Sequence, residues 1–178
     1  MFRNQEFILE VLKPLIRVKE KIVKLDPYEN SERACLNLGH TLAHALESFS
    51  SQKENPLSHG EAVGLGLLFS FCVSETLGIM KKKDFKAYVS DLKSLAILLS
   101  KDELVKRLGN DLLLNDLIFD KLLYYMLFDK KNMQAHKNKL SMVLLKSYGS
   151  LAKNKNSYLI EVDLFQLKRS WQSFILAL

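Results

Sequence analysis

Apolar residues recur three and four positions apart through most of residues 7–128, which is the spacing of one face of an α-helix. The first such run covers 7–23 and contains Pro14. A proline at this place either kinks a helix or begins a second helix at its first turn. The turn-forming residues of 26–31 then predict a loop.

A short polar motif marks the start of the most apolar helix. Ser58 and Glu61 have the spacing of a capping box, in which each side chain bonds a free backbone amide at the helix start. The segment 62–73 is apolar nearly all round, so we expect it to be the central buried helix. Gly64 and Gly66 weaken this helix, and a close approach of another segment or a ligand is the usual reason to retain them.

Further helices are predicted after this one, which Leu77–Gly78 should end. The first is an amphipathic helix over 84–99. The second is a short helix that begins at another capping box, formed by Ser100 and Glu103, and stops at Gly109. The third covers 115–128.

The pattern changes to alternation near the C-terminus. Segments 139–145 and 157–162 predict two strands around a turn at 147–149. Asp163 and Gln166 are predicted to cap a final helix that runs to the end of the chain. The fold class is therefore mainly α, a multi-helix domain with a small β-hairpin near its C-terminus.

Length and composition favour one globular domain. The chain has 178 residues, of which 48% are hydrophobic. Its start lacks the apolar core of a signal peptide, and its longest apolar stretch, 62–73, is too short to cross a bilayer. We therefore expect a cytoplasmic protein without a membrane partner. Cys35 and Cys72 lie among apolar residues and are expected to be buried thiols.

The chain is basic, with a formal net charge of +6. Its lysines are scattered, without interleaved aromatic residues and without a helix-turn-helix or RNA-binding signature. The charge is therefore expected to serve a solvated face or a pocket for an anionic small molecule, not nucleic acid.

The candidate chemistry lies in three of the four histidines. His40 and His44 are four residues apart, so on a helix they share one face. His59 falls in the first turn of the next helix, where the helix dipole favours neutral imidazole. Neutral imidazoles from two helices can hold a divalent metal, with one coordination position left open for water or substrate. Spacing alone leaves open whether His44 is a third ligand or a polar contact beside the metal, and whether the histidines are ordinary hydrogen-bonded residues instead. His136 is expected to be solvated.

These residues resemble a known family. The segments 33–47, Arg-Ala-Cys-Leu-Asn-Leu-Gly-His-Thr-Leu-Ala-His-Ala-Leu-Glu, and 59–63, His-Gly-Glu-Ala-Val, are similar to the C-terminal domain of 3-dehydroquinate synthase. Weaker matches are the lysine-rich 19–23, the acidic loop 26–33, the lysine motif 129–131 and the hairpin 142–149. The resemblance implies an N-terminal α/β domain that binds NAD and a helical C-terminal domain that binds zinc or cobalt. It also implies a homodimer in the complete enzyme.

The resemblance implies a role for each matching residue. His40 and His59 would be metal ligands. The catalytic or substrate-binding residues would be His44 near the substrate phosphate, Lys19 and Arg33 at its carboxylate and neighbouring hydroxyls, Asn37 at another contact, one of Lys130 and Lys131 at the phosphate, and Glu29 at the edge of the site. The implied reaction converts the seven-carbon phosphate DAHP to 3-dehydroquinate and phosphate, a step of the shikimate pathway towards the aromatic amino acids.

The chain departs from the family pattern at four positions. Ala43 stands where glycine is usual, Ser58 where leucine is usual, Glu32 where an apolar residue is usual, and Ser141 where a basic residue is common. The departures at Glu32 and Ser141 bear on the substrate contacts.

Two parts implied by the family are not found in this sequence. The third metal ligand is a glutamate that precedes residue 19 by several tens of residues, and no Gly-rich loop for NAD is present. We therefore expect a C-terminal part of the enzyme that is inactive and binds metal weakly without its NAD domain. The alternatives are part of another sugar-phosphate cyclase, of the inosose or valiolone synthase type, and a non-catalytic helical relic domain.

Overall fold

The computed structural model describes residues 5–29, 31–109, 116–128, 138–155 and 157–178. It confirms the mainly helical fold. The helices are α1 (Gln5–Leu25), the short 3-10 helix η1 (Glu32–Asn37), α2 (His40–Ser50), α3 (His59–Thr76), α4 (Lys82–Ser94), α5 (Lys101–Leu108), α6 (Asp116–Phe128) and α7 (Leu164–Ala177). Among the described helices, none combines the length and the apolar composition needed to cross a membrane.

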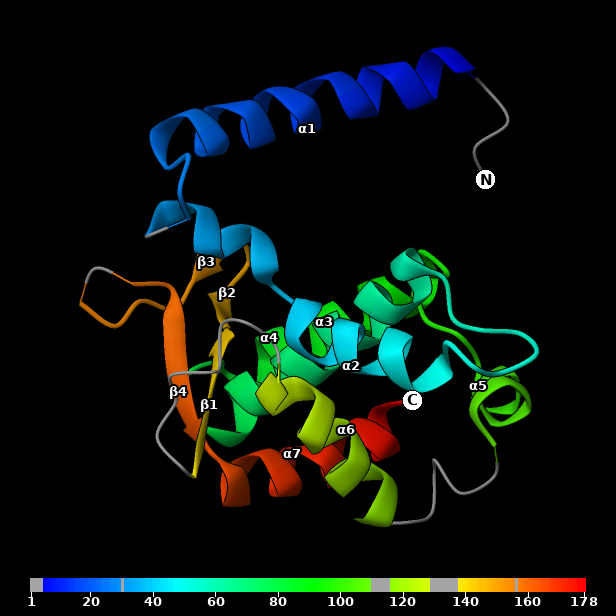
Figure 1. Cartoon of the computed structure of the whole chain (residues 1–178). Coiled ribbons are helices and arrows are strands. Elements are labelled where there is room, and N and C mark those ends of the chain that lie inside the picture. Colours follow the sequence, from blue (N-terminus) through cyan, green and yellow to red (C-terminus); the bar gives the residue numbers. More distant parts are fainter. Residues whose placement is uncertain (1–4, 30, 110–115, 129–137, 156) are drawn as a thin grey trace.

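Helix α3 is central, as its sequence predicted. It packs against α2, α4 and α7 (Figure 1). Phe69 of α3 is fully buried, and its ring meets those of Trp171 and Phe174 of α7 edge-on, at centroid distances of 6.0 and 5.9 Å. Burying such a side chain stabilises a fold by about 1.5–3 kcal/mol, so this aromatic group fixes α7 on the core.

The start of α2 rests directly on the backbone of α3. A Cβ atom on Gly66 would lie 1.9 Å from the carbonyl oxygen of Gly39, and one on Gly64 would lie 2.7 Å from that of Ile97. Gly39 is the N-cap of α2 and has a φ of +80°, a conformation that favours glycine. The predicted close approach is confirmed at both Gly64 and Gly66, and the contact at Gly66 fixes the position of His40.

Helix α4 is shorter than predicted, because the chain leaves the helix after Ser94 instead of continuing to residue 99. Ala96 adopts a φ of +52°, and the amide of Ile97 donates to the carbonyl of Leu92. These are the marks of a Schellman motif, which ends a helix. The turn brings the carbonyl of Ile97 against Gly64, so a tertiary contact overrides the local apolar pattern.

The predicted antiparallel strands near the C-terminus are confirmed, but they form two small two-stranded sheets where one hairpin was predicted. β1 (Lys139–Val143) pairs with β4 (Leu159–Asp163), and β2 (Leu145–Ser147) pairs with β3 (Ser150–Leu151), both antiparallel. The predicted turn at 147–149 joins β2 to β3. The amide of Leu145 donates to Oγ of Ser74 on α3, which separates β2 from β1.

The C-terminal helix begins where predicted but without the predicted cap. Asp163 is the N-cap of α7, yet its side chain makes no capping hydrogen bond. Lys139 lies opposite Asp163 at the end of the β1–β4 ladder, and the amide of Leu164 donates to the carbonyl of Asn138. The end of the sheet therefore sets the start of α7.

Helix α1 lies along one side of the molecule (Figure 1). It runs through Pro14 as one helix, so the alternative of a second helix beginning there is wrong. Its large apolar side chains are exposed, including Leu9, Leu12, Leu15, Ile16 and Val18. At 58%, Leu15 is more exposed than an apolar residue in a packed helix would be.

The cysteines differ in burial. Cys72 is buried, and burial, with a smaller effect of Glu75, raises the pKa of its thiol to about 12. Cys35 is only half-buried, and burial raises its pKa above the ordinary value. Both thiols are therefore held in the neutral, unreactive form at neutral pH.

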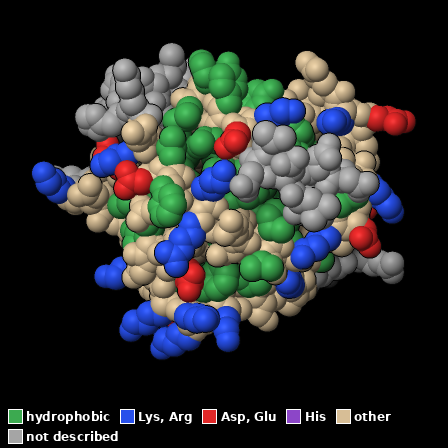
Figure 2. All heavy atoms as spheres, turned by 90° about the horizontal axis from the view of Figure 1, so that it is seen from below, with side chains coloured by type: hydrophobic (Ala, Val, Ile, Leu, Met, Phe, Trp, Pro, Cys, Tyr) green, Lys and Arg blue, Asp and Glu red, His purple; other side chains and the backbone are tan. Residues whose placement is uncertain are grey.

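Basic side chains are numerous on one face of the molecule. Figure 2 shows lysines and arginines among hydrophobic and acidic side chains over most of this face, and several of them gathered along its lower edge. Lys81, Lys82 and Lys83, the longest lysine run, are all exposed at the start of α4.

Candidate functional site

A buried carboxylate shapes the turn between α1 and η1. Oδ2 of Asp26 accepts hydrogen bonds from the amides of Ser31, at 2.8 Å, and Arg33, at 2.9 Å. Asp26 itself is only 6% exposed. Bonds of this kind to a charged acceptor are stronger than those between neutral groups, so Asp26 holds the chain as it enters η1.

Three predicted substrate residues meet at η1. Nδ2 of Asn37 donates to Oε1 of Glu29, and Nε of Arg33 lies 3.9 Å from Oε2 of the same carboxylate. Nη1 of Arg33 also donates to the carbonyl of Pro27 at 2.9 Å. The side chains of Arg33 and Glu29 are 35% and 36% exposed, so a solute can reach them.

The other predicted substrate residues are not brought into this group. Lys19 is exposed on α1, where it lines a shallow hollow of about 310 Å³ with Ile16, Glu20, Val23 and Lys24. Within the described residues, Lys19 makes no hydrogen bond or ion pair with Glu29, Arg33 or Asn37. Lys130 and Lys131, and also His136, lie outside the described residues.

The three histidines converge from two helices. The ring centroid of His40 lies 5.5 Å from that of His44, on the same helix, and 5.4 Å from that of His59, at the start of α3. His40 and His44 are half-buried, and His59 is exposed. The rings of His40 and His59, which are 19 positions apart in the sequence, therefore lie close together in space.

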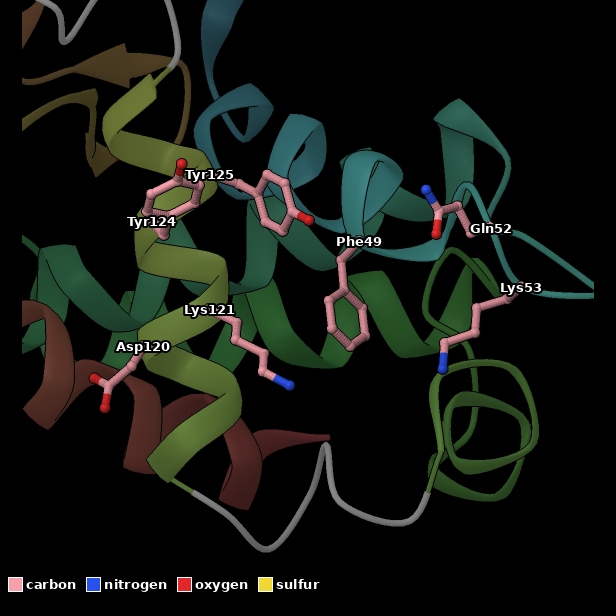
Figure 3. A pocket seen from close by; sticks show the side chains of 7 residues that line it. All are labelled: Phe49, Gln52, Lys53, Asp120, Lys121, Tyr124 and Tyr125. Atoms are coloured by element: carbon pink, nitrogen blue, oxygen red, sulfur yellow. The ribbon is translucent and has the colours of Figure 1, made fainter.

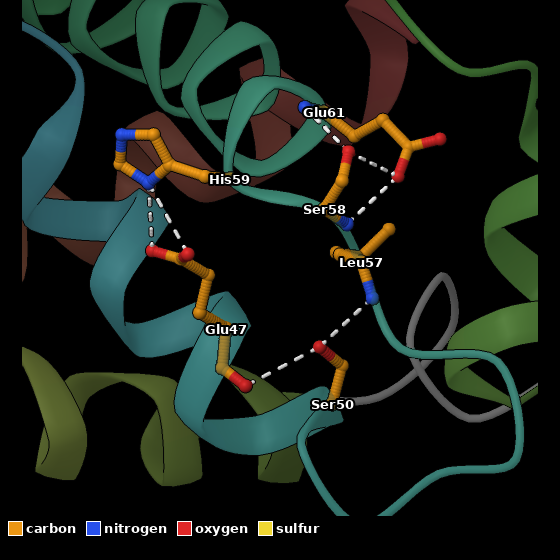
Figure 4. Close-up of polar contacts among 6 residues, drawn as sticks. All are labelled: Glu47, Ser50, Leu57, Ser58, His59 and Glu61. Carbon is orange, nitrogen blue, oxygen red and sulfur yellow. Dashed lines mark hydrogen bonds and ion pairs between the residues drawn. The ribbon is translucent and has the colours of Figure 1, made fainter.

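Each predicted metal ligand has its Nδ1 atom engaged. Nδ1 of His40 lies 3.1 Å from the carbonyl oxygen of Leu38, and Nδ1 of His59 lies 3.2 Å from both carboxylate oxygens of Glu47 (Figure 4). Oxygen partners of this kind place the proton on Nδ1 and leave the lone pair on Nε2. Figure 4 shows the other ring nitrogen of His59 pointing away from Glu47.

The donors fit part of a site for a zinc-like cation. Imidazole nitrogens are suitable ligands for Zn²⁺ or Co²⁺. Among the residues that the structure describes, however, no group of three His, Cys, Asp or Glu side chains could hold a metal ion. The metal roles of His40 and His59 therefore stay predictions.

The start of α3, which carries His59, is fixed by the predicted capping box. Oε2 of Glu61 accepts from the amide and the hydroxyl of Ser58, and the amide of Glu61 donates to Oγ of Ser58. Nη1 of Arg107 on α5 lies 2.9 Å from the same Oε2. Burial would raise the pKa of Glu61, but the bonds from Ser58 and the charge of Arg107 outweigh burial and lower it.

Glu32, one of the residues that depart from the family pattern, has an ion-pair partner in the structure. Glu32 forms an ion pair of 3.0 Å with Lys153, whose ammonium group also lies over the ring of Tyr158. Hydrogen bonds from Lys153 and then Tyr158 lower the pKa of Glu32. Glu32 is therefore engaged with the segment after β3, and its carboxylate ties η1 to the β region.

Sequence reasoning gave no role to Glu47 or Lys153. Glu47 could have been found, because it lies seven residues after His40 and three after His44, on the same helical face. The pairing of Lys153 with Glu32 joins positions 121 residues apart, and no local signal announces it.

A hollow of about 870 Å³ lies elsewhere, between the end of α2 and α6 (Figure 3). Its lining consists of Phe49, Gln52, Lys53, Asp120, Lys121, Tyr124 and Tyr125. Of the predicted site residues that the structure describes, none is among those lining it.

Comparison with known proteins decides the family. A family model described as 3-dehydroquinate synthase C-terminal matches residues 1–132. The chain belongs to this family. The resemblance seen in the histidine segments is therefore confirmed, and the helical fold is the one expected for such a domain.

Curated relatives agree with this assignment. The chain is 36% identical over 155 residues to a bifunctional 3-dehydroquinate synthase/phosphatase of Fusobacterium nucleatum, and the match covers 85% of this chain and 20% of that protein. It is 28% identical over 159 residues to a 3-dehydroquinate synthase of Chlamydia pneumoniae, covering 89% and 40%. A match to the Francisella tularensis subsp. holarctica enzyme has 31% identity over 151 residues and covers 84% and 37%. The chain thus spans 20–40% of the length of these relatives.

A solved structure shares the fold. A crystal structure of 2-deoxy-scyllo-inosose synthase, complexed with carbaglucose-6-phosphate, NAD+ and Co2+, superposes with a TM-score of 0.62 at 22% identity. The match covers 89% of this chain and 38% of that one.

Proposed function

We propose that this chain is the metal- and substrate-binding part of a 3-dehydroquinate synthase, which converts DAHP to 3-dehydroquinate and phosphate. The observation that carries the proposal is the approach of His40 and His59 to 5.4 Å from two different helices. The assigned family and the neighbouring group of Glu29, Arg33 and Asn37 support it.

The metal would be held by His40 and His59, with a third ligand from the rest of the enzyme. A divalent metal supplies Lewis acidity, which lowers the pKa of bound hydroxyls. The cobalt in the inosose synthase structure supports a metal of the zinc and cobalt class.

The residues at η1 would bind the substrate's carboxylate and hydroxyls. The guanidinium of Arg33 can hold a carboxylate through two parallel hydrogen bonds. In this structure it faces Glu29 at 3.9 Å, a loose contact that an incoming carboxylate can replace. Asn37 and Lys19 would contact hydroxyls, His44 would lie near the phosphate, and one of Lys130 and Lys131 would meet the phosphate.

NAD and the third metal ligand would belong to the remaining part of the enzyme. The NAD+ in the inosose synthase structure, and the greater length of the curated relatives, support this division. The exposed apolar side chains of α1 give that part a surface to cover, because such a row is costly in water. The complete enzyme would be a homodimer.

A second candidate is a sugar-phosphate cyclase of the inosose synthase type, which the superposition at a TM-score of 0.62 favours. The curated relatives at 28–36% identity are named 3-dehydroquinate synthases, and for this reason we put DAHP first.

The test combines this chain with the N-terminal part of the Chlamydia pneumoniae relative and measures phosphate release. We expect release from DAHP by the mixture, none by either part alone, and loss of release on chelation. A His59→Ala variant should be inactive, and a matched His136→Ala variant should be active. Release from glucose 6-phosphate instead would favour the second candidate. A mixture that binds Co²⁺ and both substrates without any release would contradict the catalytic proposal.

A further inference from the structure

We propose that Glu47 is a positioning residue that holds His59 with its proton on Nδ1, so that Nε2 is presented to a divalent cation. The part of this inference that concerns the cation rests on the proposed function. The part that concerns the ring of His59 stands on the contacts of this chain.

The contact itself is close and symmetrical. Both carboxylate oxygens of Glu47 lie 3.2 Å from Nδ1 of His59 (Figure 4). A carboxylate only accepts hydrogen bonds, so the shared hydrogen must be on Nδ1. In neutral imidazole the proton then occupies Nδ1, and the lone pair needed for a metal bond is on Nε2.

One face of α2 supplies both a predicted ligand and the orienting carboxylate. Glu47 lies two helical turns after His40, so the two side chains share a face. His59 comes from the first residue of α3, which the Ser58–Glu61 capping box holds in place. The ring of His59 thus lies between the carboxylate of Glu47 on α2 and the ring of His40, whose centroid is 5.4 Å away.

The loop between the helices is held at the base of this contact. Oγ of Ser50 donates to the carbonyl of Glu47 and accepts from the amide of Leu57, at 3.3 and 3.2 Å (Figure 4). Leu57 is buried, although the loop residues 51–56 are exposed. The backbones that carry Glu47 and His59 therefore keep their separation without help from the carboxylate. This gives Glu47 a use other than joining the helices.

Glu47 is badly placed to be a ligand itself. A metal on Nε2 lies across the ring from Nδ1, and the carboxylate oxygens are bound on the Nδ1 side. The carboxylate would therefore act through the ring, by fixing its orientation and raising its basicity. Nδ1 of His40, in contrast, lies 3.1 Å from a neutral carbonyl, that of Leu38.

The first measurement is made on the metal-free chain. Long-range ¹⁵N–¹H NMR in alkaline buffer, where imidazole is neutral, reports which ring nitrogen of each histidine is protonated. We expect His59 to be protonated on Nδ1 in the wild type and in Glu47→Gln, whose amide oxygen still accepts. We expect a mixture of both forms in Glu47→Ala. Glu54→Ala, in the exposed loop, is the matched control and should resemble the wild type. A wild-type His59 protonated on Nε2, or a Glu47→Ala spectrum identical to wild type, would overturn the proposal.

The second measurement is the affinity of the same variants for Co²⁺, monitored by visible absorption. Loss of a residue that orients a ligand costs about 10–100-fold in metal affinity, which is the loss expected for Glu47→Ala. Glu47→Gln should lose less, because it keeps the hydrogen bond. If Glu47→Gln lost as much affinity as His59→Ala, Glu47 would be a ligand, and the positioning role would be wrong.

The two measurements separate the two proposals. A wild-type chain that binds no Co²⁺ but shows the expected tautomers would contradict the metal site of the proposed function and support the action of Glu47 on His59. Binding of Co²⁺ together with unchanged tautomers in Glu47→Ala would support the metal site and contradict the action of Glu47 on His59. Thermal unfolding followed by circular dichroism checks that every variant is folded.

Discussion

Replacing Gly66 with alanine should separate α2 from α3 and disturb the histidine cluster. The new Cβ would lie 1.9 Å from the carbonyl oxygen of Gly39, whereas ordinary contact begins at 3.4 Å. The helices would have to move apart by about 1.5 Å, and no flexible side chain is available to give way, because the atom met belongs to the backbone. Overpacking of this kind costs about 1–3 kcal/mol, and we expect the upper end, about 3 kcal/mol.

The assay is unfolding in urea, monitored by circular dichroism at several temperatures. With a slope of about 2 kcal/mol per molar urea, a loss of about 3 kcal/mol lowers the midpoint by about 1.5 M. Gly60→Ala is the matched control, because nothing lies within 4 Å of its Cβ and alanine favours helices. It should leave the midpoint unchanged or raise it.

The same variant tests the link to the site. Gly39 directly precedes His40, so Gly66→Ala should also weaken Co²⁺ binding, whereas a purely global loss of stability would not change affinity in the folded fraction. A Gly66→Ala midpoint equal to that of the wild type would show that the two backbones are not in close contact at this point.

Three further predictions follow from named contacts. The pKa of Glu61 is lowered in the fold, so the carboxylate contributes fully to stability above the ordinary glutamate range, and this contribution is lost as the pH falls through the lowered pKa. Glu61→Gln should therefore flatten the acid side of a curve of unfolding free energy against pH. An unchanged curve would count against the ion pair with Arg107. His59→Ala should abolish metal binding in the reconstituted enzyme, whereas His44→Ala should keep the metal and lose turnover, as metal analysis and phosphate release will show; loss of metal in both would disprove this division. Ser74→Ala would leave the buried amide of Leu145 without its acceptor and should cost about 1–3 kcal/mol in urea unfolding, while full stability would mean that β2 finds another partner.

Much of the helical fold could be predicted because its signals are local. The Ser58–Glu61 capping box and the glycine at 78 mark the ends of α3, and the apolar run between them predicts its burial. The glycines of α3 predicted a close approach, but sequence could not say that Gly39 and Ile97 would be the partners. The sequence predicts an α4 that is too long, because the apolar pattern continues past Ala96, whereas a contact with α3 ends the helix there.

The residues of the candidate site were likewise predictable from the sequence only in part. His40, His44 and His59 could be picked out by spacing, since one helix face and one helix start determine where they point. Glu29, Arg33 and Asn37 carry no such period, because they lie on a loop and a 3-10 helix, and only the resemblance marked them. The division of the strands into two sheets could not be predicted for a related reason: the bond from Leu145 to Ser74 joins positions 71 residues apart.

The bond between Ser50 and Leu57 has a consequence for how this family can vary. Because the loop is closed at its base, residues 51–56 form an exposed tip that carries none of the contacts holding His59 in place. Closure entropy grows slowly with length, at about 0.6 kcal/mol for each doubling of a flexible loop. Insertions at this tip, including a fluorescent label or a whole guest domain, should therefore leave the histidine cluster intact, which opens 51–56 to evolutionary change and to engineering.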